Sequence, residues 1–389
     1  MEHSPITRLL HSGGEADPAA RPAVAPIYQT SVFTFPGLEA LERYYSEGEG
    51  FIYSRYGNPT IAELERAAAE LEGCDDAVAT GSGMAALLVG VLTVARGGGH
   101  VIGCGDLYGA TQALISQAES FGFTGTIVAS ADAKAVAAAI TPDTRLIVAE
   151  LVTNPTIRVT DVRALAELAH QHRARLLVDA TFATPVHCRP AELGADLVMQ
   201  SATKFYGGHN DVTAGVLCGR RSLMQPAREL AILLGTTLAP FEAWLTLRGM
   251  KTLYLRMRHQ SAQALAVAEA LAREAQVESV SYPGLPQHPD HALAQRVLHD
   301  GFGPMLAFTV KGGAEGADRF LQALRIIRFE PSFGGVTTTV THAARTSHRH
   351  IEPAERERRG IGQCLIRLNV GCEDLGDILG DLRQALARS

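Results

Sequence analysis

The chain has 389 residues, 46% hydrophobic and 20% charged, so it can bury a large core and should divide into two or three domains. Its formal net charge of −6, with no basic stretch, argues against nucleic acid or anionic lipid as the main partner. No apolar run approaches the length of a membrane span, and the first residues resemble neither a signal nor a transit peptide, so we expect a cytoplasmic protein that binds no membrane.

The expected elements begin with an arm and a large domain. Residues 1–56 are rich in glycine, proline and polar residues and contain few periodic segments, which predicts an extended arm. In residues 57–254 short apolar runs alternate with helical patterns, and this alternation predicts a mostly parallel sheet covered by helices on both faces. The seven strand candidates span 77–80, 100–104, 126–129, 146–149, 176–178, 197–200 and 214–218.

Residues 255–389 form the third part, which we expect to be a smaller α+β domain. A long alanine-rich helical stretch without a breaker, 262–275, is expected to bridge the two domains. Beyond it, 305–310 and 365–370 alternate like strands around a helix over 317–324. The predicted fold class is therefore α/β, a mostly parallel seven-stranded sheet followed by a smaller C-terminal domain.

Two strand ends of the large domain carry groups that suit a phosphorylated, nitrogen-containing ligand. The run from 76 to 84 indicates a strand, a glycine turn and a helix start, so the backbone N–H groups of Gly83 and Met84 can bind an anion. A second strand candidate ends in Asp179, which Thr181 follows closely. An aspartate there can pair with a protonated pyridine nitrogen, or it can cap a helix or a turn.

The run Ser201-Ala202-Thr203-Lys204 follows another strand candidate. A parallel sheet presents its ligands at the carboxyl ends of its strands, so Lys204 is placed where a ligand binds. The hydroxyls of Ser201 and Thr203 can bind a phosphate while the amine of Lys204 attacks an aldehyde, which the binding of pyridoxal phosphate requires. A solvated loop lysine is the simpler alternative for this run alone. Three segments that suit three ends of one cofactor favour the cofactor site.

With these motifs the chain resembles the Cys/Met-metabolism family of pyridoxal-phosphate enzymes, which includes cystathionine γ-synthase, cystathionine γ-lyase, methionine γ-lyase and O-acetylhomoserine sulfhydrylase. The resemblance covers nearly the whole length. Further blocks that carry it are 27–31, 53–60, 194–196, 247–253 and 365–371. It implies the type I fold of pyridoxal-phosphate-dependent transferases, like that of aspartate aminotransferase, with pyridoxal 5′-phosphate as cofactor.

The resemblance also implies roles around the cofactor. Lys204 would hold the cofactor as a Schiff base and move protons, Asp179 would pair with the pyridine nitrogen, and Thr181 would lie beside the ring. Tyr108 would stack on the ring and act as acid and base near the leaving group; the structural alternative is a half-buried tyrosine with a satisfied hydroxyl. The phosphate would be held by Ser201, Thr203 and the N–H groups of Gly83 and Met84.

The substrate and a second subunit complete the implied site. Arg367, Ser332 and Asn154 would bind the carboxylate of an amino-acid substrate, since a guanidinium offers two parallel donors to a planar anion. A strand arginine paired with a surface carboxylate is the alternative for Arg367. Tyr53 and Arg55 would reach the cofactor phosphate of a neighbouring subunit, with Tyr53 among the catalytic residues. This implies a homo-oligomer with shared sites, a dimer or a dimer of dimers.

Departures from the family pattern bear on the substrate. Pro331 stands before Ser332 where typical cystathionine synthases and lyases carry a glutamate that recognises a distal ammonium, and Thr337 and Thr338 replace a glutamate-serine pair. A proline offers neither a charge nor an N–H group. We therefore expect discrimination against substrates with a distal charged amino group, and preference for uncharged distal ends such as a thioether methyl or an ester.

The resemblance implies γ-elimination or γ-replacement on an L-homoserine-derived or methionine-like amino acid, the activity of a carbon-sulfur lyase or a trans-sulfuration enzyme. Cystathionine γ-synthase or γ-lyase activity proper is one alternative. A catalytically silent homologue that serves as a binding or regulatory subunit is another. We expect no metal site, because the histidine-containing segment 342–350 has no cysteine and no paired carboxylate.

Overall fold

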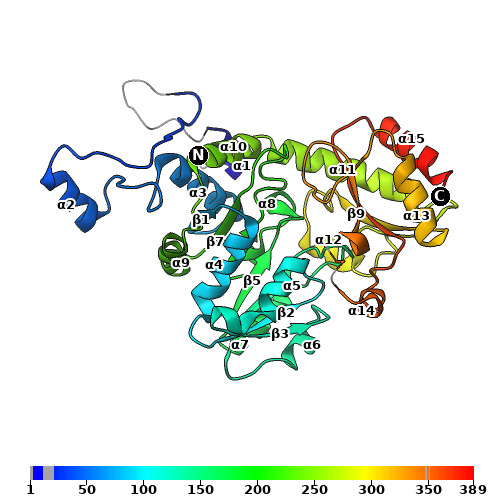
Figure 1. Ribbon diagram of the computed structural model, residues 1–389, viewed down its shortest axis with the longest axis horizontal. Coiled ribbons are helices and arrows are strands. Elements are labelled where there is room, and N and C mark those ends of the chain that lie inside the picture. The colour runs from blue at the N-terminus through cyan, green and yellow to red at the C-terminus, as the bar shows by residue number, and fades with distance from the viewer. Residues whose placement is uncertain (1–2, 12–21, 347, 350) are drawn as a thin grey trace.

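The computed structural model describes residues 3–11, 22–346, 348–349 and 351–389. The other positions include ten consecutive residues of the predicted arm, 12–21, and two positions of the histidine-containing segment, 347 and 350, so those parts of the predictions lie outside the described residues. Two sheet-containing domains lie side by side, and an N-terminal arm projects from one end (Figure 1).

The larger domain is built on a seven-stranded, mostly parallel sheet, as predicted. The strand order is β1-β7-β6-β5-β4-β2-β3, and β7 alone runs antiparallel to both of its neighbours. The strands are β1 (Asp76–Thr80), β2 (His100–Cys104), β3 (Thr124–Val128), β4 (Thr144–Glu150), β5 (Arg175–Asp179), β6 (Leu197–Gln200) and β7 (Gly215–Gly219). Because β4, β5 and β6 are adjacent and parallel, their carboxyl ends meet at one edge.

Helices cover both faces of this sheet, which is why its strands are nearly continuous apolar runs. Alternate strand residues pack into two separate hydrophobic clusters: Val78 and Leu177 join one, whereas Ala77 and Leu176 join the other. The helices of this domain are α3 (Pro59–Glu72), α4 (Gly83–Ala95), α5 (Gly109–Ser116), α6 (Ala133–Ala137), α7 (Val162–Gln171), α8 (Thr184–His187), α9 (Arg221–Leu234) and α10 (Pro240–Met250), with 3-10 turns η1 (Ala118–Phe121) and η2 (Pro190–Leu193).

The C-terminal domain has its own five-stranded sheet and its own hydrophobic cluster. Its strand order is β10-β11-β12-β9-β8, with β8 (Val277–Ser281), β9 (Met305–Val310), β10 (Arg328–Phe329), β11 (Thr339–His342) and β12 (Leu365–Asn369). Helix α11 (Leu253–Leu271) enters it from the large domain (Figure 1), and begins nine residues before the predicted stretch. The other helices are α12 (His291–Val297), α13 (Gly313–Ala323), η3 (Ala343–Arg345), α14 (Pro353–Arg358) and α15 (Leu375–Leu386).

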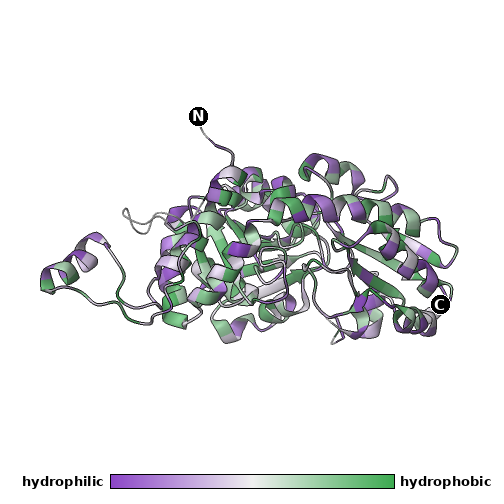
Figure 2. Ribbon diagram, turned by 90° about the horizontal axis from the view of Figure 1, so that it is seen from above, coloured by the Kyte–Doolittle hydropathy of each residue, from purple (hydrophilic) through white to green (hydrophobic). Residues whose placement is uncertain are grey.

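The two helices of the N-terminal segment differ in how they pack. Helix α1 (Pro5–His11) packs on the large domain, where Leu9 is buried and the amine of Lys251 donates to the carbonyl oxygens of Leu9 and Leu10. Helix α2 (Leu38–Glu47) has no buried residue and lies away from the rest of the chain (Figure 1). It carries hydrophobic as well as hydrophilic residues (Figure 2). Such a segment has its apolar side chains unprotected in a single copy of the chain.

Candidate active site

Lys204 lies in the turns that follow β6, and its amine is partly buried at the carboxyl edge of the sheet. The Nζ atom donates to Ser332 Oγ at 2.7 Å and lies 4.9 Å from the ring centroid of Phe333. Burial, and then the positive charge of Arg367, lower the pKa of Lys204 to about 8. An amine that loses its proton near neutral pH is a competent nucleophile toward a carbonyl carbon.

Asp179, Thr181 and Ser201 form a connected group at the ends of β5 and β6. Asp179 Oδ1 accepts hydrogen bonds from the backbone N–H of Thr181 at 2.9 Å and from its hydroxyl at 2.5 Å. The same hydroxyl oxygen accepts the N–H of Ser201 at 2.9 Å. Burial raises the pKa of Asp179, whereas the Thr181 bonds lower it. Among the described residues none donates to Asp179 Oδ2, so this oxygen can meet a ring N–H.

The predicted phosphate site is formed where α4 begins against two loops. Ser82 caps α4 by accepting the N–H of Ala85, which leaves the first N–H groups of the helix, at Gly83 and Met84, directed outward. A Cβ atom on Gly83 would lie 2.8 Å from the Cβ of Ser201, so only glycine permits this approach. Thr203 lies nearby in sequence, but its hydroxyl is hydrogen-bonded to the backbone of Ala214. The narrow space and the N–H groups fit a phosphate.

Arg367, Asn154 and Ser332 come together across the two domains. Arg367 on β12 is 3% exposed, and its Nη1 donates to Asn154 Oδ1 at 2.8 Å. Its Nη2 is 3.3 Å from Thr341 Oγ1 and 3.5 Å from the carbonyl oxygen of Ser332. Burial lowers the pKa of Arg367 to about 10, which still leaves it charged at neutral pH. A buried guanidinium without a partner carboxylate among these contacts is suited to bind the carboxylate of a ligand.

Tyr108 lies near Arg367, whereas the arm residues Tyr53 and Arg55 lie elsewhere in the same chain. Tyr108 stands directly before α5, is 42% exposed, and is close enough to Arg367 to affect the pKa of that guanidinium. Tyr53 and Arg55 are not brought to Lys204 within one chain. Arg55 donates to the carbonyl oxygen of Ile232 and borders a cavity of about 1300 Å³.

Two residues that the sequence analysis missed lie within this site. Phe333 packs under both cations, because the guanidinium carbon of Arg367 is also 4.9 Å from its ring centroid. Glu150, the last residue of β4, accepts the backbone N–H groups of Tyr108 and Asn154. A signal for Glu150 was present, since a carboxylate at a strand end is the pattern that drew attention to Asp179.

A second cavity, of about 720 Å³, opens beside Ser332. Its walls include Thr203 and three carboxylate residues, Asp211, Glu242 and Glu330. The cavity beside Ser332 is therefore lined in part by acidic side chains, although Pro331, the residue before Ser332, carries no charge. Across the described part of the chain no three His, Cys, Asp or Glu residues are grouped so as to hold a metal ion, and no described helix is long and apolar enough to cross a membrane.

Fold and site together define an enzyme of the type I pyridoxal-phosphate fold, which uses pyridoxal 5′-phosphate as cofactor. The chain belongs to the family described as Cys/Met metabolism PLP-dependent enzyme, whose model matches residues 6–387. The family predicted from the motifs is thus confirmed.

The names of individual relatives state several different activities. An O-succinylhomoserine sulfhydrylase of Pseudomonas aeruginosa is 42% identical over 93% of this chain and 90% of its own length. An L-methionine gamma-lyase of Pseudomonas putida is 40% identical, with 98% and 97% covered. Among solved structures, cystathionine gamma synthase from Xanthomonas oryzae pv. oryzae, in complex with aminoacrylate and cysteine, has a TM-score of 0.94 at 35% identity and covers 100% of this chain and 99% of that one.

Proposed function

We propose that this enzyme catalyses γ-elimination or γ-replacement on an L-homoserine-derived or methionine-like amino acid. The observation that carries the proposal is the position of the Lys204 amine, 2.7 Å from Ser332 Oγ and beside the Arg367–Asn154 pair. An amine of lowered pKa next to a carboxylate-binding guanidinium can move protons on an amino acid that the guanidinium holds.

Each residue then has a defined task. Pyridoxal 5′-phosphate, when bound, supplies an electron-withdrawing ring that acidifies the substrate's Cα–H bond. Lys204 takes and returns protons at Cα and Cβ, and Arg367 with Asn154 and Ser332 orients the carboxylate. Tyr108 acts near the leaving group at Cγ. Asp179 and Thr181 hold the ring, while Ser201 and the N–H groups of Gly83 and Met84 hold the phosphate; Thr203 joins them when its hydroxyl turns from the backbone of Ala214 toward the phosphate.

A second copy of the chain belongs to the same proposal. Tyr53 and Arg55 do not reach Lys204 in their own chain, and Arg55 borders the larger cavity. Large hydrophobic side chains are exposed on both the arm and the region of α9 and α10: Leu38, Tyr45, Leu233 and Phe241. A partner that covers these surfaces would receive Tyr53 and Arg55 at its own cofactor phosphate. We also place the enzyme in the cytoplasm, since all six cysteines are free thiols.

The distal end of the substrate separates two candidate activities. Pro331, which is exposed in a single copy of the chain, favours an uncharged distal group, as in methionine or an O-acyl homoserine, because it offers a distal ammonium no charged partner. Cystathionine γ-synthase activity is favoured by a different observation, the carboxylates of Asp211, Glu242 and Glu330 around the cavity beside Ser332. Mycobacterium bovis cystathionine gamma-synthase, 42% identical over 98% of this chain and 96% of its own length, is compatible with that alternative.

The test is a screen of the purified enzyme with pyridoxal phosphate against methionine, cystathionine, O-acetylhomoserine and O-succinylhomoserine. Release of 2-oxobutyrate reports elimination, and consumption of an added thiol or of cysteine reports replacement. We expect methionine or an ester to give the highest kcat/KM. A clear preference for cystathionine, or for cysteine as nucleophile, would select the second candidate. Absence of turnover with all four would refute both.

A further inference from the structure

Glu150 is a buried carboxylate to which neither the predicted cofactor contacts nor the predicted substrate contacts give a task. It ends β4 at the carboxyl edge of the sheet, is 5% exposed, and lies in register with Asp179 on the neighbouring strand β5. Two carboxylates side by side in the interior repel each other. Burial, and then the charge of Asp179, accordingly raise the pKa of Glu150. A group this unfavourable needs compensating contacts.

Those contacts reach the two sides of the proposed site. Glu150 Oε1 accepts the backbone N–H of Tyr108 at 2.5 Å, and Oε2 accepts the backbone N–H of Asn154 at 3.0 Å. Tyr108 stands at the start of α5, and Asn154 is the residue whose side chain accepts from Arg367. The Glu150 side chain therefore bridges Tyr108, which is proposed to face the leaving group, and the Asn154–Arg367 pair, which is proposed to hold the carboxylate.

We propose that Glu150 is a positioning residue for the reaction: it fixes the distance between Tyr108 and the Asn154–Arg367 pair by accepting one backbone N–H group from each. This inference rests on the proposed function. Both oxygens of the Glu150 carboxyl act as acceptors toward the two N–H groups. A glutamine of the same size offers one acceptor oxygen and an NH2 group, which cannot accept the second N–H.

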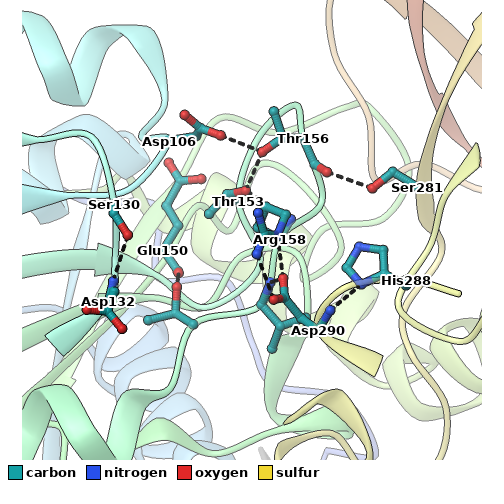
Figure 3. Close-up of polar contacts among 12 residues, drawn as sticks. Asp106, Ser130, Asp132, Glu150, Thr153, Thr156, Arg158, Ser281, His288 and Asp290 are labelled. Atoms are coloured by element: carbon teal, nitrogen blue, oxygen red, sulfur yellow. Dashed lines mark hydrogen bonds and ion pairs between the residues drawn. The ribbon is translucent and has the colours of Figure 1, made fainter. Parts of the chain in front are cut away.

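The loop that contains Asn154 has independent anchors, so loss of one Glu150 contact should loosen it without unfolding it. The Thr156 hydroxyl donates to Asp106 at 2.6 Å, and the Ser281 hydroxyl donates to the carbonyl oxygen of Thr156 at 2.8 Å. Arg158 forms two hydrogen bonds with Asp290, at 2.6 and 2.8 Å. In Figure 3 Glu150 is drawn beside these anchors, with Asp106 above it and the Arg158–Asp290 pair to its right.

The experiment compares Glu150→Gln with the wild type and with Asp381→Asn. Asp381 is also a buried carboxylate that accepts backbone N–H groups, those of residues 325–327, but it lies in the C-terminal domain away from the site. The Asp381→Asn variant measures how much stability is lost when a buried carboxylate that accepts backbone N–H groups is replaced outside the site. The probe is L-norleucine, the methionine isostere with a methylene in place of sulfur, which has no Cγ leaving group. Its Kd is read from the absorbance of the bound cofactor.

We expect Glu150→Gln to weaken norleucine binding by about tenfold or more, the factor that corresponds to 1.4 kcal/mol, and to lower kcat for methionine or an ester as well. Asp381→Asn should change Tm but leave the norleucine Kd unchanged. In an Asn154→Ala background the Glu150→Gln substitution should have a much smaller effect on Kd, because it acts through Asn154.

Several outcomes would overturn the inference. A Glu150→Gln variant with the wild-type Kd and kcat would do so, and so would a full effect that persists in the Asn154→Ala background. If Glu150→Gln does not fold, Glu150→Asp is used, which keeps the charge but is one methylene too short to reach both N–H groups; a wild-type Kd for that variant would contradict the proposal. Wild-type enzyme that binds the cofactor but turns over none of the four amino acids of the screen would instead refute the proposed function.

Discussion

Replacing Arg367 with lysine tests the substrate-binding end of the site while keeping its positive charge. The guanidinium donates to Asn154 Oδ1 at 2.8 Å and reaches Thr341 Oγ1 and the carbonyl oxygen of Ser332 with its other terminal nitrogen. A lysine has one nitrogen and cannot present two parallel donors to a carboxylate. Loss of one charge-assisted hydrogen bond costs about 1.5–3 kcal/mol, so kcat/KM should fall roughly 10- to 150-fold.

Most of this loss should be seen in KM, because the contact to the carboxylate is present in the bound substrate as well as in the transition state. The assay is steady-state kinetics with the best substrate of the screen, alongside the cofactor absorbance. Arg175→Lys is the control, since Arg175 pairs with Asp196 at the opposite end of β5 from Asp179 and should change Tm only. If Arg367→Lys keeps kcat/KM within about twofold of the wild type, Arg367 does not bind the substrate's carboxylate.

Three further predictions concern the lysine, the substrate and the assembly. Because burial and Arg367 lower the pKa of Lys204 to about 8, the neutral amine predominates only above that pH. The rate at which the cofactor-free enzyme takes up pyridoxal phosphate, measured by absorbance, should therefore rise with pH and level off above about 8. A rate that still rises beyond about pH 10 would contradict this. Pro331→Glu should raise kcat/KM for cystathionine relative to methionine and O-acetylhomoserine by about tenfold, since 1.4 kcal/mol suffices, and an unchanged ranking would disprove the assigned role of Pro331. Arg55→Ala and Lys204→Ala subunits, each inactive alone, should recover activity when mixed, because hybrids contain an intact site; inactive hybrids of verified mass would exclude shared sites.

The large-domain sheet was predictable because each strand is buried on both faces and is therefore a short apolar run between helical patterns. The same pattern located Asp179 and Lys204, which follow such runs directly. It gave no strand order; in the structure the two residues meet because β5 and β6 are neighbours. The extent of α11 was less predictable, since its first residues, near Leu253, pack against the large domain and carry no alanine-rich signal.

Contacts made by backbone groups escaped the sequence analysis. Glu150 accepts N–H groups from residues 42 and 4 positions away, and no side-chain pattern encodes a backbone donor at that distance. The carboxylates beside Ser332 were missed for a similar reason, because Asp211, Glu242 and Glu330 meet only after both domains have folded. The packing of α1 on the large domain was not predicted either, because it involves Lys251, which is distant in the chain and contacts the end of that helix.

The most direct test of the account is the attachment of the cofactor to Lys204. Wild-type enzyme with pyridoxal phosphate is reduced with borohydride, digested and analysed by mass spectrometry, in parallel with Lys204→Ala. We predict that the added mass of the cofactor is found on the peptide containing Lys204, that the variant shows neither this mass nor the cofactor absorbance nor turnover, and that its circular dichroism matches the wild type. A variant that keeps a full cofactor absorbance band, with the added mass on another lysine, would contradict the central claim.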